Sequence, residues 1–378
     1  MFLQIHTLVS YPVSLLNRDD AGLAKRIPFG NATRLRVSSQ CLKRHWREDL
    51  TARLPDLPDG LRTRSFFTRA VLPRLVAGGL SLERAQALLE PLATAMIKGG
   101  VDKNGDMSQP VLFGLREADY FVTLIQQCAE GAADTAAAVK ALAERLKSAD
   151  EKKNLAAMSK AGAGLTAALF GRFVTSDMLA RVDAPVHVAH AFTVHAADTE
   201  MDYFTVVDDL NRDDETGAAH ANQTELGAGV YYGHVAVDVP LLVSNLSGCA
   251  RAQWKQQDSA TAASVLQALV RSIASRSPGA KLGSTAPYSR AELVLLEAGT
   301  EQPRTLANAF LEALKPSGHV LQTAAERMAG QLSRIDAMYG PTAATRTLAT
   351  TLEPAAFAPL VVQPLDEATR GALAAVWA

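Results

Sequence analysis

Residues 34–47 read Arg-Leu-Arg-Val-Ser-Ser-Gln-Cys-Leu-Lys-Arg-His-Trp-Arg, and they join a short extended piece to a helix. Arg34–Val37 alternates charged and apolar residues, which is typical of an extended segment. Ser38 or Ser39 can cap the N-terminus of a helix, because a serine hydroxyl accepts a hydrogen bond from a backbone N–H of the first turn. The stretch therefore predicts a short strand followed by a helix that ends near Leu50.

The predicted helix has two unlike sides. Leu42 and Trp46 are four residues apart and lie one above the other, so they form an apolar stripe that packs inward. Lys43, Arg44 and Arg47 lie within about 100° of one another on the adjacent face. One face of the helix is therefore expected to pack, while the other carries positive charge toward solvent.

This positive charge belongs to a longer basic segment. From Arg18 to Arg74 the sequence has 13 Lys and Arg against 6 Asp and Glu, a local charge of +7 in a chain whose formal net charge is −1. Nucleic-acid affinity depends on the few cations that touch phosphate and not on the net charge, so this local excess favours nucleic-acid binding. The alternative is a solvated basic face without a ligand.

Length and composition indicate an ordinary globular protein. The chain has 378 residues, of which 48% are hydrophobic and 20% charged, which fits one elaborated domain or more than one. The sequence shows neither a long apolar run nor a signal-peptide pattern, so we predict a cytoplasmic protein without membrane contact. Cys41, Cys128 and Cys249 are far apart and odd in number, which is typical of free thiols and not of a disulfide framework or a zinc site.

The remaining pattern extends the opening strand and helix into an α+β core. Strands are predicted at Phe2–Val9, Val186–His195, Val230–Val239 and Ala291–Glu297, and a second helix after Asp258. Together with the helix of the opening stretch, the order is strand, helix, two strands, helix, strand. This is the order of a ferredoxin-like or RRM-like core.

Two long segments interrupt the predicted core. Residues 58–181 are alanine-rich with helical apolar spacing, so they are expected to form a helical insertion. A polar excursion of about thirty residues separates the two middle strands, which is longer than an ordinary hairpin loop. It contains Met201-Asp202-Tyr203-Phe204, whose aromatic side chains either stack on unpaired bases or anchor the base of the loop.

Catalytic patterns are weak. The sequence has no Gly-x-Ser-x-Gly elbow, and on one strand His187 and His195 would point to the face opposite to that of His190, which disfavours a metal cluster. Three pairs of neighbouring aspartates could hold a divalent ion for phosphodiester cleavage, or could instead orient arginines and cap turns. These pairs are Asp19-Asp20, Asp208-Asp209 and Asp213-Asp214.

Several separated motifs resemble one family. They are Leu16-Asn17-Arg18-Asp19-Asp20, Phe29-Gly30, Arg34 to Gln40 with Leu42-Lys43-Arg44, Gly171-Arg172 with Thr175-Ser176, Ala189-His190-Ala191, Phe204 to Leu210, Pro278-Gly279-Ala280-Lys281 and Ala307-Asn308-Ala309-Phe310. In this order they resemble the CasC backbone subunit of type I-E CRISPR Cascade complexes. The resemblance is strong over about residues 1–50 and 160–235, moderate over 260–340 and faint elsewhere.

The resemblance implies a hand-like α+β fold. An RRM-like palm would comprise residues 1–57, 182–198 and 228–378, with helical fingers at 58–181 and a thumb loop at 199–227. Copies of such a subunit line up along a CRISPR RNA within a Cascade complex that contains other subunits. The guide bases then pair with target DNA, so pairing supplies the sequence specificity and the protein supplies shape and charge.

The resemblance also implies the RNA-binding residues. Backbone contacts are predicted at Arg18, Lys25, Arg34, Arg36, Ser38, Gln40, Lys43, Arg44, Arg47 and Lys281, and stacking on bases at Phe173, Tyr203 and Phe204. Guanidinium and ammonium groups suit phosphate, and exposed aromatic rings suit a kink in the strand. The sequence departs from the family after Lys281, where Leu-Gly-Ser replaces a more basic stretch, and at Phe173, where members can carry methionine.

The sequence thus predicts a non-catalytic, sequence-independent guide-RNA-binding subunit with no cofactor and no metal. Two alternatives remain. Related type III backbone subunits cut RNA with a metal-bound aspartate, so the paired aspartates could make this chain an endoribonuclease. A helical scaffold without nucleic acid is the other.

Overall fold

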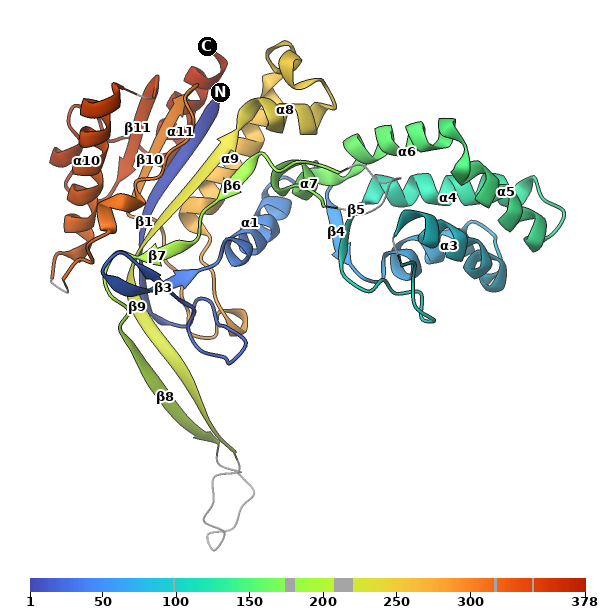
Figure 1. The fold of residues 1–378 in the computed structure, drawn as a ribbon, viewed down its shortest axis with the longest axis horizontal. Coiled ribbons are helices and arrows are strands. Elements are labelled where there is room, and N and C mark those ends of the chain that lie inside the picture. Colours follow the sequence, from blue (N-terminus) through green and yellow to red (C-terminus); the bar gives the residue numbers. More distant parts are fainter. Residues whose placement is uncertain (98, 174–180, 207–219, 316–317, 342) are drawn as a thin grey trace, which may run out of the picture. The chain divides into compact units, whose positions relative to one another are not determined.

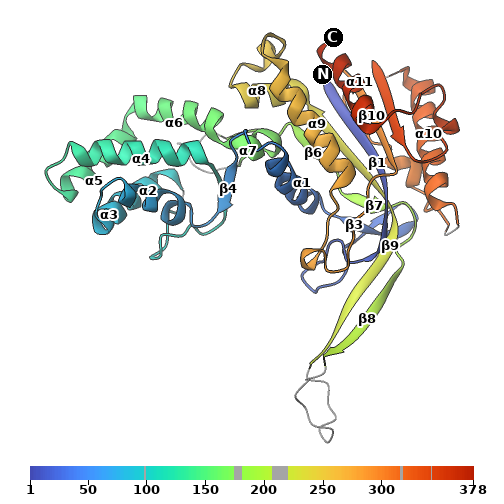
Figure 2. The same cartoon turned by 180° about the vertical axis from the view of Figure 1, so that it is seen from behind.

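The computed structural model describes residues 1–97, 99–173, 181–206, 220–315, 318–341 and 343–378. These residues form two compact units, drawn as ribbons in Figures 1 and 2. Unit 1 comprises residues 1–50, 187–239 and 263–378, and unit 2 comprises residues 51–186 and 240–262. In the described part of the chain, no helix is both long and apolar enough to cross a membrane.

Unit 1 is built on a mixed α/β arrangement around one large sheet. Its strand order is β11-β10-β1-β9-β7-β3-β2, with β6 and β8 also pairing with β9. The strands are β1 (Phe2–Ser14), β2 (Arg26–Phe29), β3 (Ala32–Val37), β6 (Val186–Val188), β7 (Ala191–Thr193), β8 (Thr199–Val206), β9 (His220–Asp238), β10 (Leu293–Gly299) and β11 (Thr345–Thr350). β1 is central and pairs antiparallel with both β9 and β10.

Helices cover both faces of this sheet because β1 is apolar on both sides. On one face Ile5 of β1 shares a small cavity with Trp46 of α1 (Ser39–Arg53) and Ile273 of α9 (Ser259–Ser275). On the other face Leu8 packs in a cluster with Met328 of α10 (Val320–Tyr339). Figure 2 shows α1 and α9 alongside the sheet. Helix α11 (Leu365–Trp377) packs on β10 and β11.

A buried polar cluster lies on the α10 side of the sheet. Glu297 of β10 is fully buried and accepts hydrogen bonds from His6 Nε2 (3.1 Å) and Arg304 (2.6 and 2.8 Å). Arg346 of β11 donates to the same carboxylate at 2.7 Å. Burial lowers the pKa of His6, so the ring is neutral and its Nδ1 accepts from the Tyr232 hydroxyl at 2.9 Å. The carboxylate therefore joins three strands of the sheet.

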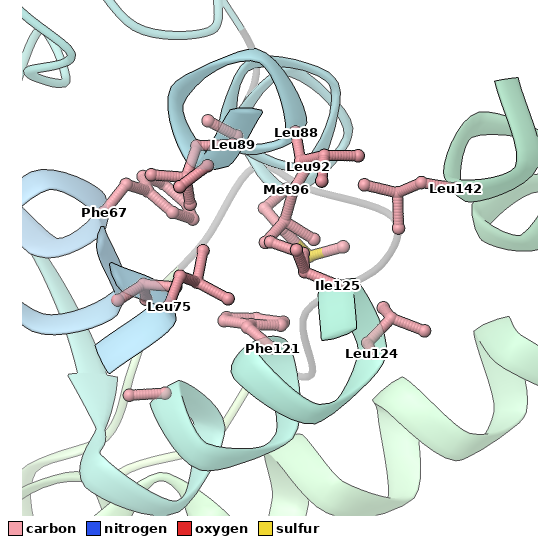
Figure 3. Packing of buried hydrophobic residues seen from close by; sticks show 14 of the residues in the cluster. Phe67, Leu75, Leu88, Leu89, Leu92, Met96, Phe121, Leu124, Ile125 and Leu142 are labelled. Atoms are coloured by element: carbon pink, nitrogen blue, oxygen red, sulfur yellow. The ribbon is translucent and has the colours of Figure 1, made fainter. Parts of the chain in front are cut away.

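Unit 2 is mostly helical, with one two-stranded ribbon. The elements are β4 (Gly60–Thr63), the π-helix η1 (Phe67–Val71), α2 (Leu72–Ala77), α3 (Leu82–Met96), β5 (Val111–Gly114), α4 (Leu115–Glu130), α5 (Thr135–Lys147), α6 (Ala149–Gly162), α7 (Gly164–Phe170), α8 (Val239–Ser247) and the 3₁₀ helix η2 (Arg251–Gln256). Figure 3 shows its core, in which Phe67, Leu88 and Phe121 converge from η1, α3 and α4. Strands β4 and β5 pair antiparallel beside this core.

The sequence predicted strands β1, β3, β9 and β10, helices α1 and α9 and the helical character of residues 58–181, and the structure corrects the following points. The predicted helical insertion also contains the β4–β5 ribbon. The predicted strand Val186–His195 is broken into β6 and β7 around Ala189 and His190. The described part of the predicted thumb loop is an antiparallel hairpin of β8 and the first half of β9. The predicted strand that ended at Val239 ends at Asp238, and Val239 begins α8. The C-terminal region, expected to be mostly helical, also contains the edge strand β11.

Candidate nucleic-acid interface

The loop between β1 and β2 is tied to the start of α1 through Asn17. Its side-chain oxygen accepts from the Ser38 N–H at 3.0 Å, and its carbonyl accepts from the Lys25 N–H at 2.9 Å. Asp19 closes the loop tip by accepting from the Leu23 N–H at 2.9 Å. The loop therefore has a fixed conformation that presents the exposed Arg18 and the half-buried Lys25 next to the helix N-terminus.

Basic side chains converge on His190. Arg36 Nη1 lies 2.8 Å from His190 Nδ1, so the neutral imidazole accepts this hydrogen bond. Partial burial first, and then the positive charges of Arg36, Lys25 and Lys43, lower the pKa of His190. Three cations from the loop, β3 and α1 thus act on one ring in the break between β6 and β7. No local pattern in the sequence predicted this role for His190, which lies in the motif Ala189-His190-Ala191.

His190 should make RNA binding depend on pH. A phosphate bound among these cations would offset their charge and raise the pKa of His190, so binding would take up a proton. We expect RNA affinity to rise roughly threefold from pH 7.5 to pH 6.0, where the unperturbed imidazole titrates. His190→Gln should flatten this profile, whereas His319→Gln, at an exposed histidine of the same unit, should leave it unchanged. Fluorescence anisotropy with labelled RNA measures both, and an unaltered profile in His190→Gln would exclude the ring from the interface.

The outer face of α1 carries the other predicted contacts of this helix. Gln40 and Arg44 are exposed, and Lys43 and Arg47 are half-buried one turn apart. Arg44 forms a 3.1 Å ion pair with Glu48 on the next turn. An exposed pair of this kind is weak and exchanges readily for phosphate. The helix therefore presents a row of donors beside the loop that holds Arg18 and Lys25.

Arg34 is a correction to the predicted contacts. Its side chain is fully buried, and its guanidinium donates to the carbonyl of Thr193 at 3.0 Å and to that of Phe310 at 2.7 Å. Phosphate cannot reach the guanidinium there. Its hydrogen bonds instead join β3 to the interior of the sheet. Ser38 is also buried, and its hydroxyl accepts from the Cys41 N–H at 3.3 Å, which confirms the predicted helix cap. Alternation along β3 places Arg34 inside and Arg36 at the surface.

The hairpin of β8 and β9 carries the two predicted aromatic residues. Tyr203 and Phe204 are consecutive on β8, so their rings point to opposite faces of the hairpin, and they are 67% and 39% exposed. Rings this exposed make few contacts within the chain and are available for stacking on bases. Residues 207–219 of the predicted thumb lie outside the described residues.

Glu225 fastens the base of this hairpin to the basic loop. Its buried carboxylate accepts from the Ala24 N–H at 2.7 Å, from the Thr199 hydroxyl at 2.7 Å and from Arg26. Burial alone would raise the pKa of Glu225, but the hydrogen bonds from Thr199, Arg26 and Ala24 lower it. The direction of the hairpin and the position of the loop are therefore coupled. An isolated glutamate in a strand gave no sequence signal for this role.

Neutralising Glu225 should loosen the hairpin without removing a phosphate contact. For Glu225→Gln we expect the free energy of unfolding to fall by about 1–2 kcal/mol, because one buried acceptor loses its charge. RNA affinity should change little, but the contrast between reactive and protected nucleotides in a 2′-hydroxyl acylation profile should diminish. Glu200→Gln, at an exposed position of β8, is the matched control. A full contrast in Glu225→Gln would show that the carboxylate does not orient the hairpin.

The loop after α9 brings Lys281 to the same hairpin. The Lys281 ammonium donates to the Thr224 hydroxyl at 2.7 Å and lies 5.9 Å from the centre of the Phe204 ring. The preceding residue is held on the β1–β2 loop, because the Ala280 N–H donates to the Leu15 carbonyl at 2.9 Å. Lys281 and Leu282 adopt positive φ angles of 49° and 57°, an unfavourable backbone conformation for residues with side chains. The structure thus brings together Lys281, Phe204 and the basic loop.

Phe173 belongs to unit 2, whereas the site residues described so far belong to unit 1. It follows α7 and is 73% exposed, with the Arg181 guanidinium 5.6 Å from the centre of its ring. Residues 174–180, which include the quoted Thr175-Ser176, lie outside the described residues.

Of the three aspartate pairs that could make the chain an endoribonuclease, the structure describes Asp19-Asp20. Asp19 serves the turn described above, and the described residues contain no group of three or more His, Cys, Asp or Glu side chains that could hold a metal ion. Asp208-Asp209 and Asp213-Asp214 lie outside the described residues.

Comparisons with known proteins agree with the motifs found in the sequence. One chain of a solved structure, "CRISPR RNA-guided surveillance complex, pre-nicking", is 27% identical, with 100% of both chains covered and a TM-score of 0.80. Another, "CRISPR RNA-guided surveillance complex", is 23% identical over 99% of both chains with a TM-score of 0.62, and it shows likeness of fold alone. No curated protein matches. The resemblance to Cascade backbone subunits is confirmed. Because the family model described as CT1975-like protein matches residues 3–376, the chain belongs to that family.

Proposed function

We propose that this protein binds the backbone of a CRISPR guide RNA without regard to sequence. The observation that carries the proposal is the contact of Arg36 with His190 beside the loop that holds Arg18 and Lys25, next to a hairpin with exposed aromatic rings. Cations fixed by backbone hydrogen bonds suit phosphates, and they carry no information about bases. Family membership and the solved surveillance complexes support the same assignment.

The fold supports the assignment of a palm, fingers and a thumb to separate parts of the chain. Strand β1, helix α1, strands β7 and β9, helix α9 and strand β10 follow one another in β-α-β-β-α-β order, which suits an RRM-like palm. Unit 2 would serve as the fingers, and the hairpin of β8 and β9 as the thumb that kinks the strand. The RNA contacts would be made by Arg18, Lys25, Arg36, Gln40, Lys43, Arg44, Arg47 and Lys281, with stacking by Phe173, Tyr203 and Phe204.

In this proposal several copies bind along one guide RNA in a type I-E Cascade complex of the cytoplasm, together with other subunits. The exposed guide bases then pair with target DNA. The subunit itself is non-catalytic and needs no cofactor, because its contribution is to hold the guide in a shape that leaves the bases free.

Purification of the full chain from cells that transcribe a repeat–spacer RNA tests this function. We expect the protein to retain that RNA at physiological salt, with an absorbance ratio at 260 to 280 nm well above that of protein alone. Sequencing of the retained RNA should show spacers of unrelated sequence. Protein that elutes without RNA would refute the proposal. Incubating the particle with Mg²⁺ and a complementary RNA tests the non-catalytic part, which cleavage would contradict.

A further inference from the structure

The segment that carries Lys281 follows α9 and forms a closed loop. At its ends, the Ser277 hydroxyl donates to the Ser289 carbonyl at 2.8 Å and accepts from the Ser289 N–H at 2.9 Å. Inside the loop the backbone turns back on itself, since a side chain on Gly279 would meet the Gly283 Cα atom at 3.0 Å. In Figure 2 this segment is the orange loop below α9. The position of Lys281 therefore depends on what holds the closed loop as a whole.

The tip of this loop has an unfavourable backbone conformation. Lys281, Leu282 and Ala286 have φ angles of 49°, 57° and 49°, in the region that favours glycine. Such residues keep this conformation only where surrounding contacts hold it. Leu282 is also 96% exposed, so its apolar side chain gains nothing from burial within the described residues. Contacts beside the tip must therefore hold the loop in place.

The residues just before the tip rest on α1. Besides the bond from the Ala280 N–H to the β1–β2 loop, the Gly279 N–H donates to Nε2 of His45 on α1, at 3.4 Å. Pro278 of the loop lines the same small cavity as Trp46, the residue that follows His45. His45 is therefore a side chain through which the backbone of the loop is held on the helix.

His45 is neutral at pH 7 and can therefore act as an acceptor. Burial is the main cause that lowers the pKa of its ring. The charge of Glu48 opposes this shift, and the charges of Arg276 and Arg44 add to it. A neutral ring that accepts at Nε2 carries its proton on Nδ1. Because the ring is neutral, its replacement by an uncharged residue leaves the charge of the RNA-binding surface unchanged.

We propose that His45 positions Lys281 for its contact with an RNA phosphate by holding the Gly279 N–H. Without this acceptor the loop can leave α1. The Lys281 ammonium, which lies on the Thr224 hydroxyl and 5.9 Å from the centre of the Phe204 ring, then loses its fixed place. A neutral side chain that touches no phosphate thus contributes to the electrostatic part of RNA binding. The inference rests on the proposed function and on the part of Lys281 in it.

The salt dependence of RNA affinity in the full chain tests this role. His45→Leu removes the acceptor but no charge, and we expect it to lower RNA affinity about threefold. The slope of log affinity against log salt should fall by about 0.7, the value for one phosphate contact of single-stranded RNA. His45→Gln, whose amide oxygen can accept the same N–H, should restore both quantities. Both replacements suit a half-buried helix position, so the fold is expected to be retained. An unchanged slope in His45→Leu, or an equal loss in His45→Gln, would overturn the positioning role.

A double-mutant cycle separates positioning of Lys281 from direct contact between His45 and RNA. Lys281→Ala should lower RNA affinity about fivefold, and adding His45→Leu should lower it no further, because the loop then has no charge to position. Arg36→Ala is the control, since this cation belongs to β3, and its effect should add to that of His45→Leu. Additive effects of His45→Leu and Lys281→Ala would overturn the proposal while the parent protein still binds RNA. A parent protein without RNA affinity would instead refute the proposed function.

Discussion

Glu297→Ala should lower the free energy of unfolding by about 3–5 kcal/mol. The carboxylate is fully buried and accepts hydrogen bonds from His6, Arg304 and Arg346, so its removal leaves the Arg304 guanidinium without a counter-charge, while Arg346 keeps its pair with Asp336. Leaving a buried charge unpaired costs far more than the pair itself contributes. Urea unfolding followed by circular dichroism measures the change.

The same carboxylate should make this difference depend on pH. Burial alone would raise the pKa of Glu297, but hydrogen bonds from His6 and Arg304 lower it well below its ordinary value. A carboxylate with a lowered pKa in the folded state contributes stability above its unfolded pKa of about 4.3, and this is lost as the pH falls. The gap between Glu297→Ala and the parent should therefore narrow below about pH 4. Glu301→Ala, at an exposed position nearby, should change stability little, and a loss as small as this for Glu297→Ala would contradict the buried cluster.

Replacing Lys43 and Arg47 together by alanine should lower RNA affinity roughly 30-fold, at about 1 kcal/mol for each lost phosphate contact. The two residues are one turn apart on α1, and Lys43 is among the cations that lower the pKa of His190. Because each contact with single-stranded RNA releases counterions, the slope of log affinity against log salt should also fall by about 1.4. Titrations at several salt concentrations measure both quantities.

The control for this double variant removes the same charge elsewhere. Arg334→Ala with Arg370→Ala changes two exposed arginines of α10 and α11 in the same unit, so it alters net charge equally without touching α1. We expect its salt slope to equal that of the parent protein. If the variant of Lys43 and Arg47 had the same salt slope as the parent protein, α1 would not be part of the RNA-binding surface.

Local patterns in the sequence predicted the elements that carry the site. The apolar run of β1, the serine cap of α1 and the spacing of Leu42 and Trp46 each lie within a few residues of sequence, and the structure confirms the strand, the cap and the buried stripe. The order of strands and helices followed from these pieces. By contrast, β11 lies at the sheet edge, and the break around His190 depends on pairing with a distant strand, so neither has a strong local signal.

In the site too, features with a local signal were predictable from the sequence, and features that depend on distant residues were not. Charge counting identified the basic segment, but it could not separate Arg34, which bonds to the carbonyls of Thr193 and Phe310, from Arg36 at the surface. The distinction follows from which face of β3 is covered, and this is set by residues more than a hundred positions away. Glu225 was missed for a related reason, because its partners Ala24 and Arg26 lie about 200 positions earlier in the chain.

In the proposed function, the basic surface of unit 1 holds the RNA by its backbone. Its most direct test is the affinity of the full chain for several RNAs of equal length and unrelated, unstructured sequence, each titrated at several salt concentrations. The proposal predicts affinities equal within about twofold and a common, steep salt slope, because phosphates are the same in every RNA. Affinities that differ more than about tenfold between sequences, or a slope near zero, would contradict it.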